Sequence, residues 1–322
     1  MKQQTLNSAD VESRPRASKP SNSITIHGFS AHVCLTACQL FIQTPLRKLS
    51  LRNRATGNRF ESMKNYVAER VSNVDRYERL FSRIVNLQGK TVLELGCSRG
   101  YLLNAFLERR SFSAIGADID PDCLARARAL HGDRIKFVRS TATSIPVPDN
   151  SVDVVYSIDT FEHLSRPHAI LTDVHRILKP GGHFLVHFGP WYNPYGAHLE
   201  DIIPFPWPHV FFSMDTLLNV AAYLYESPDY IPACYWHDDN GNRRPNPYLD
   251  REMWHEYLNH VTIRKFKKLL RTLPFETIHF QRIGFEGNSY RVATLLNAFS
   301  GIPVLEELLI SFIFCALRKR SL

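Results

Sequence analysis

The sequence predicts an α/β fold built on a doubly wound, mostly parallel sheet, and two features support this prediction. Short apolar segments of strand length alternate with segments of helical spacing between residues 91 and 188. A glycine-containing turn, Gly96–Gly100, joins the first apolar segment to the helix expected after it. Since parallel strands need long crossover connections, which helices usually provide, the alternation indicates consecutive βαβ units.

The expected strands and helices follow one another in a regular order. Apolar positions recur at helical spacing from Glu61 to Leu87, so helices precede the first strand. Five strands are then expected, at Thr91–Leu95, Ala114–Ile119, Ile135–Arg139, Val152–Ile158 and His183–Phe188. The later part of the chain adds a helix and two strands, at Thr262–Leu273, Glu276–Ile283 and Ile310–Leu317.

Local signals support several of these boundaries. Pro121 suits the first turn of the helix after the second strand. Val152–Ile158 is mostly apolar, as a strand covered on both faces should be. The helix from about His168 to Leu178 meets a cation, a proline and two glycines at residues 179–182, an expected stop signal.

Composition divides the chain into four segments. Residues 1–60 are a basic, partly disordered arm with one loosely docked helix near residues 32–42, residues 61–189 form the core, and residues 262–322 complete the sheet. Residues 190–261 form an insertion, whose first 68 residues hold 15 of the aromatic residues, all four tryptophans and nine prolines. Such a long segment seldom serves as a mere connector, so we expect a cap over a substrate, or rings that form the insertion's own core.

Charge and cysteine content limit the partners and the compartment. Residues 1–60 hold nine Lys and Arg against two acidic residues, a net charge of +7 out of the chain's +8. The core is therefore near neutral, which argues against a nucleic-acid-binding face. No apolar run has the length of a membrane span, and no secretory signal is expected. Six dispersed cysteines without a metal-binding spacing favour a reducing, cytoplasmic location.

The glycine turn and an acid further on indicate a nucleoside-containing ligand. The three glycine positions of a dinucleotide-binding turn read Gly96, Ser98 and Tyr101 here, so two of the three glycines are absent. Asp118 lies 22 residues after Gly96, at the end of the second strand. An acid at that distance can accept both hydroxyls of a ribose, whereas Asp120 is better placed to cap the following helix.

Five motifs in sequence order resemble the class I S-adenosylmethionine-dependent methyltransferases, in particular the type 11-like domain. The motifs are Val92-Leu93-Glu94-Leu95-Gly96-Cys97, Ile115-Gly116-Ala117-Asp118, Pro146-Val147-Pro148-Asp149-Asn150-Ser151-Val152-Asp153, Phe161-Glu162-His163-Leu164 and Arg176-Ile177-Leu178-Lys179-Pro180-Gly181-Gly182. The resemblance implies a Rossmann-like sheet of seven strands, with the insertion after the fifth strand, and S-adenosylmethionine as cofactor.

The resemblance also assigns roles to individual residues. Glu94 would hold the methionine amino group, directly or through water, and the backbone of the glycine turn would pass beneath the methionine. Asp118 would bind the ribose, and Ile119 would pack on the adenine. Relatives often carry an acid after the third strand for the adenine amino group, where this chain has Thr141 followed by Ala142. The complete expected cofactor set is Glu94, Gly96, Cys97, Ser98, Gly100, Asp118, Ile119, Thr141, Ala142 and Asp159.

The acceptor site is expected beyond the carboxyl ends of the fourth and fifth strands. His198 is the first candidate for a general base because an imidazole titrates near neutrality, and His163 and His209 are the others. Each of these histidines has an ordinary structural alternative. We expect no metal site, since His198, Asp201 and His209 match no known ligand spacing.

The expected reaction is methyl transfer to a small or medium-sized acceptor that is apolar or aromatic. The alternatives are a protein that binds S-adenosylmethionine without transferring the methyl group, and an RNA methyltransferase that uses the basic arm. A nicotinamide-dependent oxidoreductase would require the glycines that are missing at Ser98 and Tyr101. The sequence leaves open the acceptor, the atom methylated and the oligomeric state.

Overall fold

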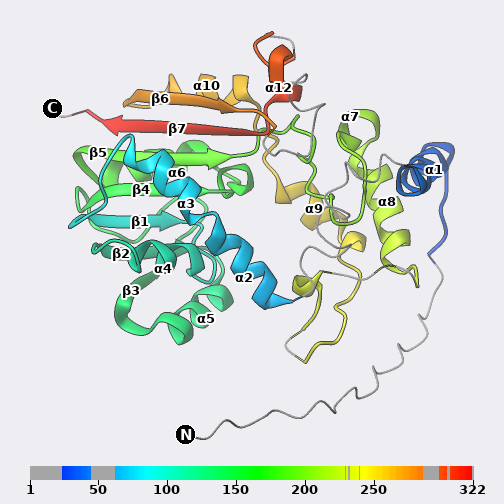
Figure 1. Ribbon diagram of the computed structural model, residues 1–322, viewed down its shortest axis with the longest axis horizontal. Coiled ribbons are helices and arrows are strands. Elements are labelled where there is room, and N and C mark those ends of the chain that lie inside the picture. The colour runs from blue at the N-terminus through cyan, green and yellow to red at the C-terminus, as the bar shows by residue number, and fades with distance from the viewer. Residues whose placement is uncertain are drawn as a thin grey trace, which may run out of the picture.

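A seven-stranded sheet forms the centre of the computed structural model, which describes residues 24–44, 62–228, 230, 233–238, 240–285, 297–302 and 305–320. The strand order is β3-β2-β1-β4-β5-β7-β6. Neighbouring strands from β3 to β5 run parallel, and β7 alone runs antiparallel to β5 and β6 (Figure 1). The predicted doubly wound, mostly parallel sheet of seven strands is confirmed.

The described strands and helices have the following bounds. The strands are β1 Thr91–Leu95, β2 Ser113–Asp118, β3 Ile135–Arg139, β4 Val152–Ile158, β5 Leu178–Phe188, β6 Phe275–Ile283 and β7 Phe312–Lys319. The α-helices are α1 Phe29–Gln43, α2 Met63–Ser72, α3 Val74–Ser82, α4 Tyr101–Leu107, α5 Pro121–His131, α6 Pro167–Ile177, α7 Pro208–Phe211, α8 Met214–Tyr225, α9 Arg251–Tyr257, α10 Ile263–Leu270 and α12 Glu306–Leu309. Short 3₁₀ helices are η3 Gly132–Arg134, η4 Phe161–His163, η5 Cys234–Trp236 and η6 Pro247–Leu249.

Helices cover both faces of the sheet, as a doubly wound fold requires. On one face, α6 and α10 pack on side chains such as Leu93, Val155 and Phe184. On the other face, α3, α4 and α5 pack on the alternate residues of the same strands, among them Val92 and Leu185. The carboxyl ends of the parallel strands therefore remain free of these helices, and they face the insertion (Figure 1).

The fifth strand begins earlier than the sequence indicates. Helix α6 ends at Ile177, and Leu178 already pairs with Val152 of β4. The pairing then shifts register before it resumes at His183, and Gly181 has φ of 75°. The proline and glycines that were expected to form a loop thus occupy an irregular start of the strand, where a missing N–H and a positive φ are tolerated.

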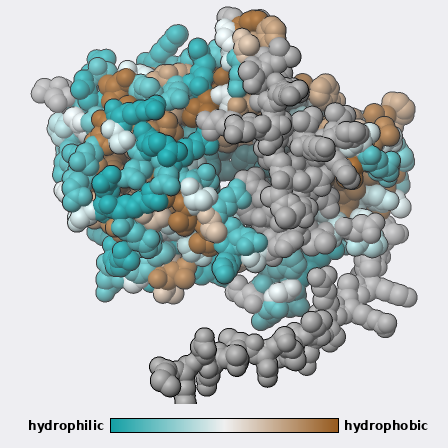
Figure 2. Space-filling model, in the orientation of Figure 1, coloured by the Kyte–Doolittle hydropathy of each residue, from teal (hydrophilic) through white to brown (hydrophobic). Residues whose placement is uncertain are grey.

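The insertion packs on itself and on α1. Helix α8 supplies much of this core, together with aromatic residues of the insertion such as Tyr225, Tyr248 and Trp254. Cys34 and Cys38 of α1 are fully buried in the same cluster, so this helix is not loosely docked as expected. The outer side of α1 carries exposed apolar residues, and hydrophobic side chains gather at that end of the molecule in Figure 2. The basic stretch of residues 47–59 lies outside the described residues.

No helix among the described residues is both long and apolar enough to cross a membrane.

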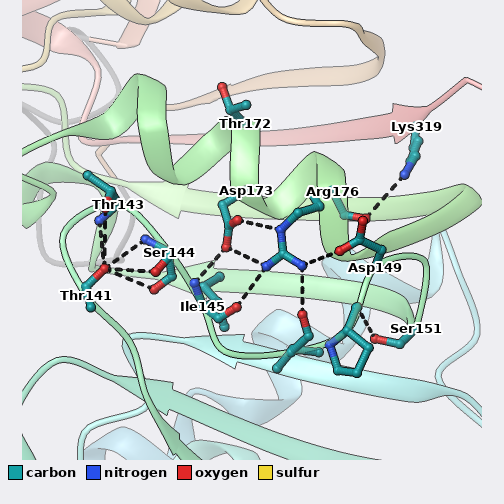
Figure 3. A network of polar contacts seen from close by, with 12 residues as sticks. Thr141, Thr143, Ser144, Ile145, Asp149, Ser151, Thr172, Asp173, Arg176 and Lys319 are labelled. Carbon is teal, nitrogen blue, oxygen red and sulfur yellow. Dashed lines mark hydrogen bonds and ion pairs between the residues drawn. The ribbon is translucent and has the colours of Figure 1, made fainter.

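Arg176 explains why two of the sequence motifs occur together. Its guanidinium donates hydrogen bonds to the carbonyls of Ile145 and Val147, both at 2.9 Å, and forms ion pairs with Asp149 and Asp173 (Figure 3). Asp173 in turn accepts the N–H of Ile145 at 2.6 Å. The residues around position 146 and the end of α6 are therefore bonded to each other, and their role is structural.

Replacing Arg176 with Met should lower the free energy of unfolding by about 2 kcal/mol or more. The substitution leaves Asp173 and two carbonyls without their partner, and a hydrogen bond to a charged group contributes roughly 1.5–3 kcal/mol. Urea unfolding measures the change. Arg318→Ala is the control, because its pair with Glu276 is about half exposed and should contribute less than about 1 kcal/mol. Equal losses in the two variants would contradict this assignment.

Candidate functional site

The turn after β1 has the backbone conformation that its glycines suggest. Gly96, Ser98 and Gly100 all have positive φ, of 77°, 48° and 73°. A Cβ added at Gly96 would overlap the side chain of Thr160, and one at Gly100 would lie 2.9 Å from the ring of Phe137. The turn therefore has positive φ at all three of these positions, and Ser98 shows that a small side chain fits its middle position.

Asp118 is held at the end of β2 with its carboxylate oriented by two backbone groups. Its Oδ2 accepts the N–H of Ser98 at 2.7 Å and its Oδ1 accepts the N–H of Asp120 at 3.0 Å. Asp120 caps α5 through the N–H groups of Asp122 and Cys123, as expected. Next to Asp118, the side chain of Ile119 is 57% exposed, an open apolar surface at the edge of the site.

Thr141 lies in a turn in which its hydroxyl is already engaged. The Oγ1 accepts the N–H groups of Thr143 at 3.2 Å and Ser144 at 3.0 Å (Figure 3). Ala142 is part of the same turn. Because the hydroxyl closes this turn, the backbone around Ala142 is better placed than the Thr141 side chain to meet a ligand.

Glu94 is a buried carboxylate next to a cation that the sequence did not single out. Its side chain is 5% exposed, and its Oε2 has no hydrogen-bond partner among the described residues. Burial raises the pKa of Glu94 to about 8, although the positive charge of Arg70 opposes this effect. Burying an oxygen without a hydrogen-bond partner costs free energy, unless a bound ligand supplies that partner.

Arg70 joins the helix before the sheet to the loop after β4. Its Nη1 lies 3.2 Å from Oδ2 of Asp159. Oδ1 of Asp159 also lies 3.2 Å from Nδ1 of His187. The backbone of Asp159 has a positive φ of 50°. Burial acts to raise the pKa of Asp159, but the His187 hydrogen bond and the charge of Arg70 together lower it to about 2. The site therefore holds a guanidinium that pairs with Asp159 and whose charge also acts on Glu94.

Cys97 contributes packing to the turn. It is 5% exposed, and a Cβ added at Gly116 of β2 would lie 2.9 Å from its sulfur. Burial raises the pKa of the thiol far above its usual value, so it stays protonated. Such a thiol is unreactive.

Two of the three candidate histidines come together. The rings of His163 and His198 have centroids 5.0 Å apart, whereas His209 packs on Trp191 with centroids 4.6 Å apart. Burial lowers the pKa of each of these histidines to about 4. The near-neutral titration expected for His198 is therefore wrong, because its surroundings penalise the charged ring. A neutral imidazole of low pKa is a weak general base at pH 7.

The structure does not bring together the three metal ligands considered from the sequence, which are His198, Asp201 and His209. The carboxylate of Asp201 instead accepts hydrogen bonds from the Tyr235 hydroxyl at 3.1 Å, the Trp236 indole at 3.0 Å and the Tyr248 hydroxyl at 3.3 Å. It belongs to the aromatic core of the insertion. Among the described residues, His163 and His198 converge on Glu162.

Sequence reasoning missed Arg70, His187 and Asn259. Asn259 donates its N–H to the Glu162 carbonyl at 2.8 Å and its side-chain amide to the carbonyls of Phe161 and Leu164, which fixes the loop after β4. No motif marks these residues, because each lies on a different segment and acquires its partner only when the chain folds. The one available signal was the placement of polar residues at strand and helix ends.

The comparisons with known proteins agree with this geometry. Residues 93–186 match the family model described as a methyltransferase domain. An uncharacterized methyltransferase of Mycobacterium bovis is 35% identical over 111 residues, which cover 34% of this chain and 43% of the relative. One from Mycobacteroides abscessus is 31% identical over 118 residues, 35% of this chain and 45% of the relative. The chain thus matches less than half the length of these relatives.

A solved S-adenosylmethionine-dependent methyltransferase from Mesorhizobium loti superposes with a TM-score of 0.47 at 18% identity, covering 77% of this chain and 99% of that structure. The matched residues 93–186 contain the last three residues of β1, the glycine turn, Asp118 and the loop after β4. Residues 93–186 of this chain are therefore similar to the methyltransferase domain family.

Proposed function

We propose that this protein transfers a methyl group from S-adenosylmethionine to a small or medium-sized acceptor. The observation that carries the proposal is the position of two carboxylates near the glycine turn. Glu94 precedes the turn in β1, and Asp118 lies at the end of β2. Glu94 has an unpartnered buried oxygen, and Asp118 has a carboxylate fixed by two backbone N–H groups. These features suit a ligand with an ammonium group at one end and a ribose at the other.

Each end of the cofactor has residues of matching chemistry. Asp118 would accept the ribose hydroxyls, Ile119 would pack under the adenine, and the backbone near Ala142 would meet its edge. Glu94 would hold the methionine ammonium. We add Arg70 to this set, because its guanidinium pairs with Asp159, its charge acts on Glu94, and a carboxylate is its natural partner.

The bound cofactor would supply a methyl group on a sulfonium, which needs no covalent intermediate on the protein. The residues of this chain would position the acceptor in line and exclude water. Helices of the insertion lie opposite the carboxyl ends of the strands, where an open α/β sheet binds its ligands (Figure 1). Tyr257 at the end of α9 contacts His163, with ring centroids 4.4 Å apart, so the insertion reaches the loop after β4.

The acceptor class is inferred from the aromatic residues at the junction between the insertion and the methyltransferase domain. Many rings of the insertion, such as Tyr225 and Tyr248, fill its own core. Trp191 and Tyr257 instead lie among histidines at the junction with the methyltransferase domain. Side chains of this kind favour an apolar or planar acceptor.

Asp118→Ala should weaken S-adenosylhomocysteine binding at least about tenfold in a folded protein. The substitution removes hydrogen bonds to a charged group, each contributing roughly 1.5–3 kcal/mol, and 1.4 kcal/mol corresponds to a factor of ten. Isothermal titration calorimetry gives the affinity. Asp133→Ala, an exposed acid beyond α5, is the matched control and should bind as the wild type does. Unchanged affinity in Asp118→Ala would remove the main support for this site.

Binding should release a proton from Glu94. With a pKa of about 8 the group is mostly protonated at pH 7, and it must ionise to hold an ammonium. Affinity for S-adenosylhomocysteine should therefore rise between about pH 6 and about pH 8 and then level off. Calorimetry in buffers of different ionisation enthalpy measures the proton release. Glu94→Gln should abolish it while Asp118→Ala retains it, and equal release in wild type and Glu94→Gln would contradict the role.

Turnover tests the transfer itself. The purified full chain, incubated with S-adenosylmethionine carrying a labelled methyl group and a panel of planar and aliphatic acceptors, should form labelled product together with S-adenosylhomocysteine. Cofactor binding without transfer to any acceptor would favour a binding protein. A wild-type protein that is folded and has no affinity for the cofactor would refute the proposal.

A further inference from the structure

Three side chains that can each ligate a metal converge at the junction of the methyltransferase domain and the insertion. Glu162 and His163 lie on η4, just after β4, and His198 lies in the loop that follows β5. One ligand atom from each residue lies within 4.8 Å of the other two. Residues 35 positions apart in the chain are thus brought to one point by the neighbouring strands β4 and β5.

The imidazole of His163 is in the form that binds metal. Nδ1 of His163 lies 3.0 Å from the Tyr257 carbonyl, so this nitrogen donates its proton and Nε2 carries a free lone pair. A carbonyl in this position is the usual support of a metal-bound histidine.

The carboxylate lacks a cation of its own. Glu162 is 6% exposed, and its Oε2 has no hydrogen-bond partner among the described residues. The guanidinium of Arg70 pairs with Asp159, and no described residue forms an ion pair with Glu162. A divalent ion at this point would compensate the cost of burying this carboxylate.

The surrounding backbone holds these residues in place. Asn259 donates its N–H to the Glu162 carbonyl at 2.8 Å. His198 has φ of 54°, an uncommon conformation for a residue with a side chain, and its N–H donates to the Tyr195 carbonyl at 2.9 Å. A residue held at positive φ is found most often where geometry serves a site.

We propose that Glu162, His163 and His198 form a binding site for one divalent transition-metal ion beside the methyl-transfer position. Two nitrogen donors and one carboxylate suit Zn²⁺ and its neighbours Fe²⁺ and Co²⁺, whereas Mg²⁺ and Ca²⁺ prefer oxygen ligands. Three protein ligands leave at least one position open. That position would select acceptors with an oxygen donor; this last point rests on the proposed function, and the metal site itself does not.

Metal binding by the full chain tests the site directly. The protein is treated with a chelator, dialysed, and titrated with Zn²⁺ in competition with a chromophoric chelator, and Co²⁺ is added separately to record its visible absorption. Wild type should bind one ion per chain. His163→Ala and His198→Ala should each weaken Zn²⁺ binding by more than about 100-fold, since loss of a supporting partner alone costs roughly 10–100-fold.

Two further variants keep the result interpretable. Glu162→Gln preserves the shape of the side chain and should weaken Zn²⁺ binding as the histidine variants do. It therefore tests the metal site even if a histidine variant fails to fold. His175→Ala is the control, because this histidine is also part-buried against a phenylalanine, at the end of α6, and should leave Zn²⁺ affinity unchanged. Circular dichroism verifies the fold of each variant.

The outcomes separate this inference from the proposed function. Absence of stoichiometric Zn²⁺ binding, binding that survives Glu162→Gln in a folded protein, or a Co²⁺ spectrum with thiolate charge-transfer bands would overturn the metal site. None of these results changes S-adenosylhomocysteine affinity in the metal-free wild type, which tests the proposed function alone.

Discussion

The contact between Gly96 and Thr160 is the constraint on which the site depends. A Cβ at position 96 would overlap the Thr160 side chain, so the turn after β1 and the loop after β4 can lie this close only because residue 96 is glycine. That approach sets the glycine turn, Glu94 and Asp118 against the loop that carries Asp159, Glu162 and His163. In the proposed function, the cofactor-binding residues and the acceptor-binding residues would thereby form one site at the carboxyl end of the sheet.

Electrostatics within this site follow from burial and from a single guanidinium. Arg70 pairs with Asp159 and its charge also acts on Glu94, and the two carboxylates respond differently. Asp159 has a direct ion pair and a histidine partner, so its pKa falls to about 2, while Glu94 is more completely enclosed and its pKa rises to about 8. Neighbouring carboxylates with pKa values shifted in opposite directions are common at functional sites.

The sequence predicts the sheet well, since its strands are short, apolar and separated by helices, and β1, β3 and β4 have the predicted bounds. Position-specific signals also hold: Asp120 caps α5, and the turn glycines have positive φ. The sequence does not show which distant segments of the chain contact each other. Arg70 reaches Asp159 across 89 residues, and His163 meets Tyr257 across 94. Burial likewise decides the pKa of His198, and an isolated histidine in a loop shows nothing of its burial.

A crystal structure with S-adenosylhomocysteine bound would test the central claim most directly. The account predicts the ribose hydroxyls on Asp118, the adenine over Ile119, and the sulfur on the side of the cleft that faces Glu162, His163 and His198. A ligand bound elsewhere, or one whose ribose makes no contact with Asp118, would contradict it.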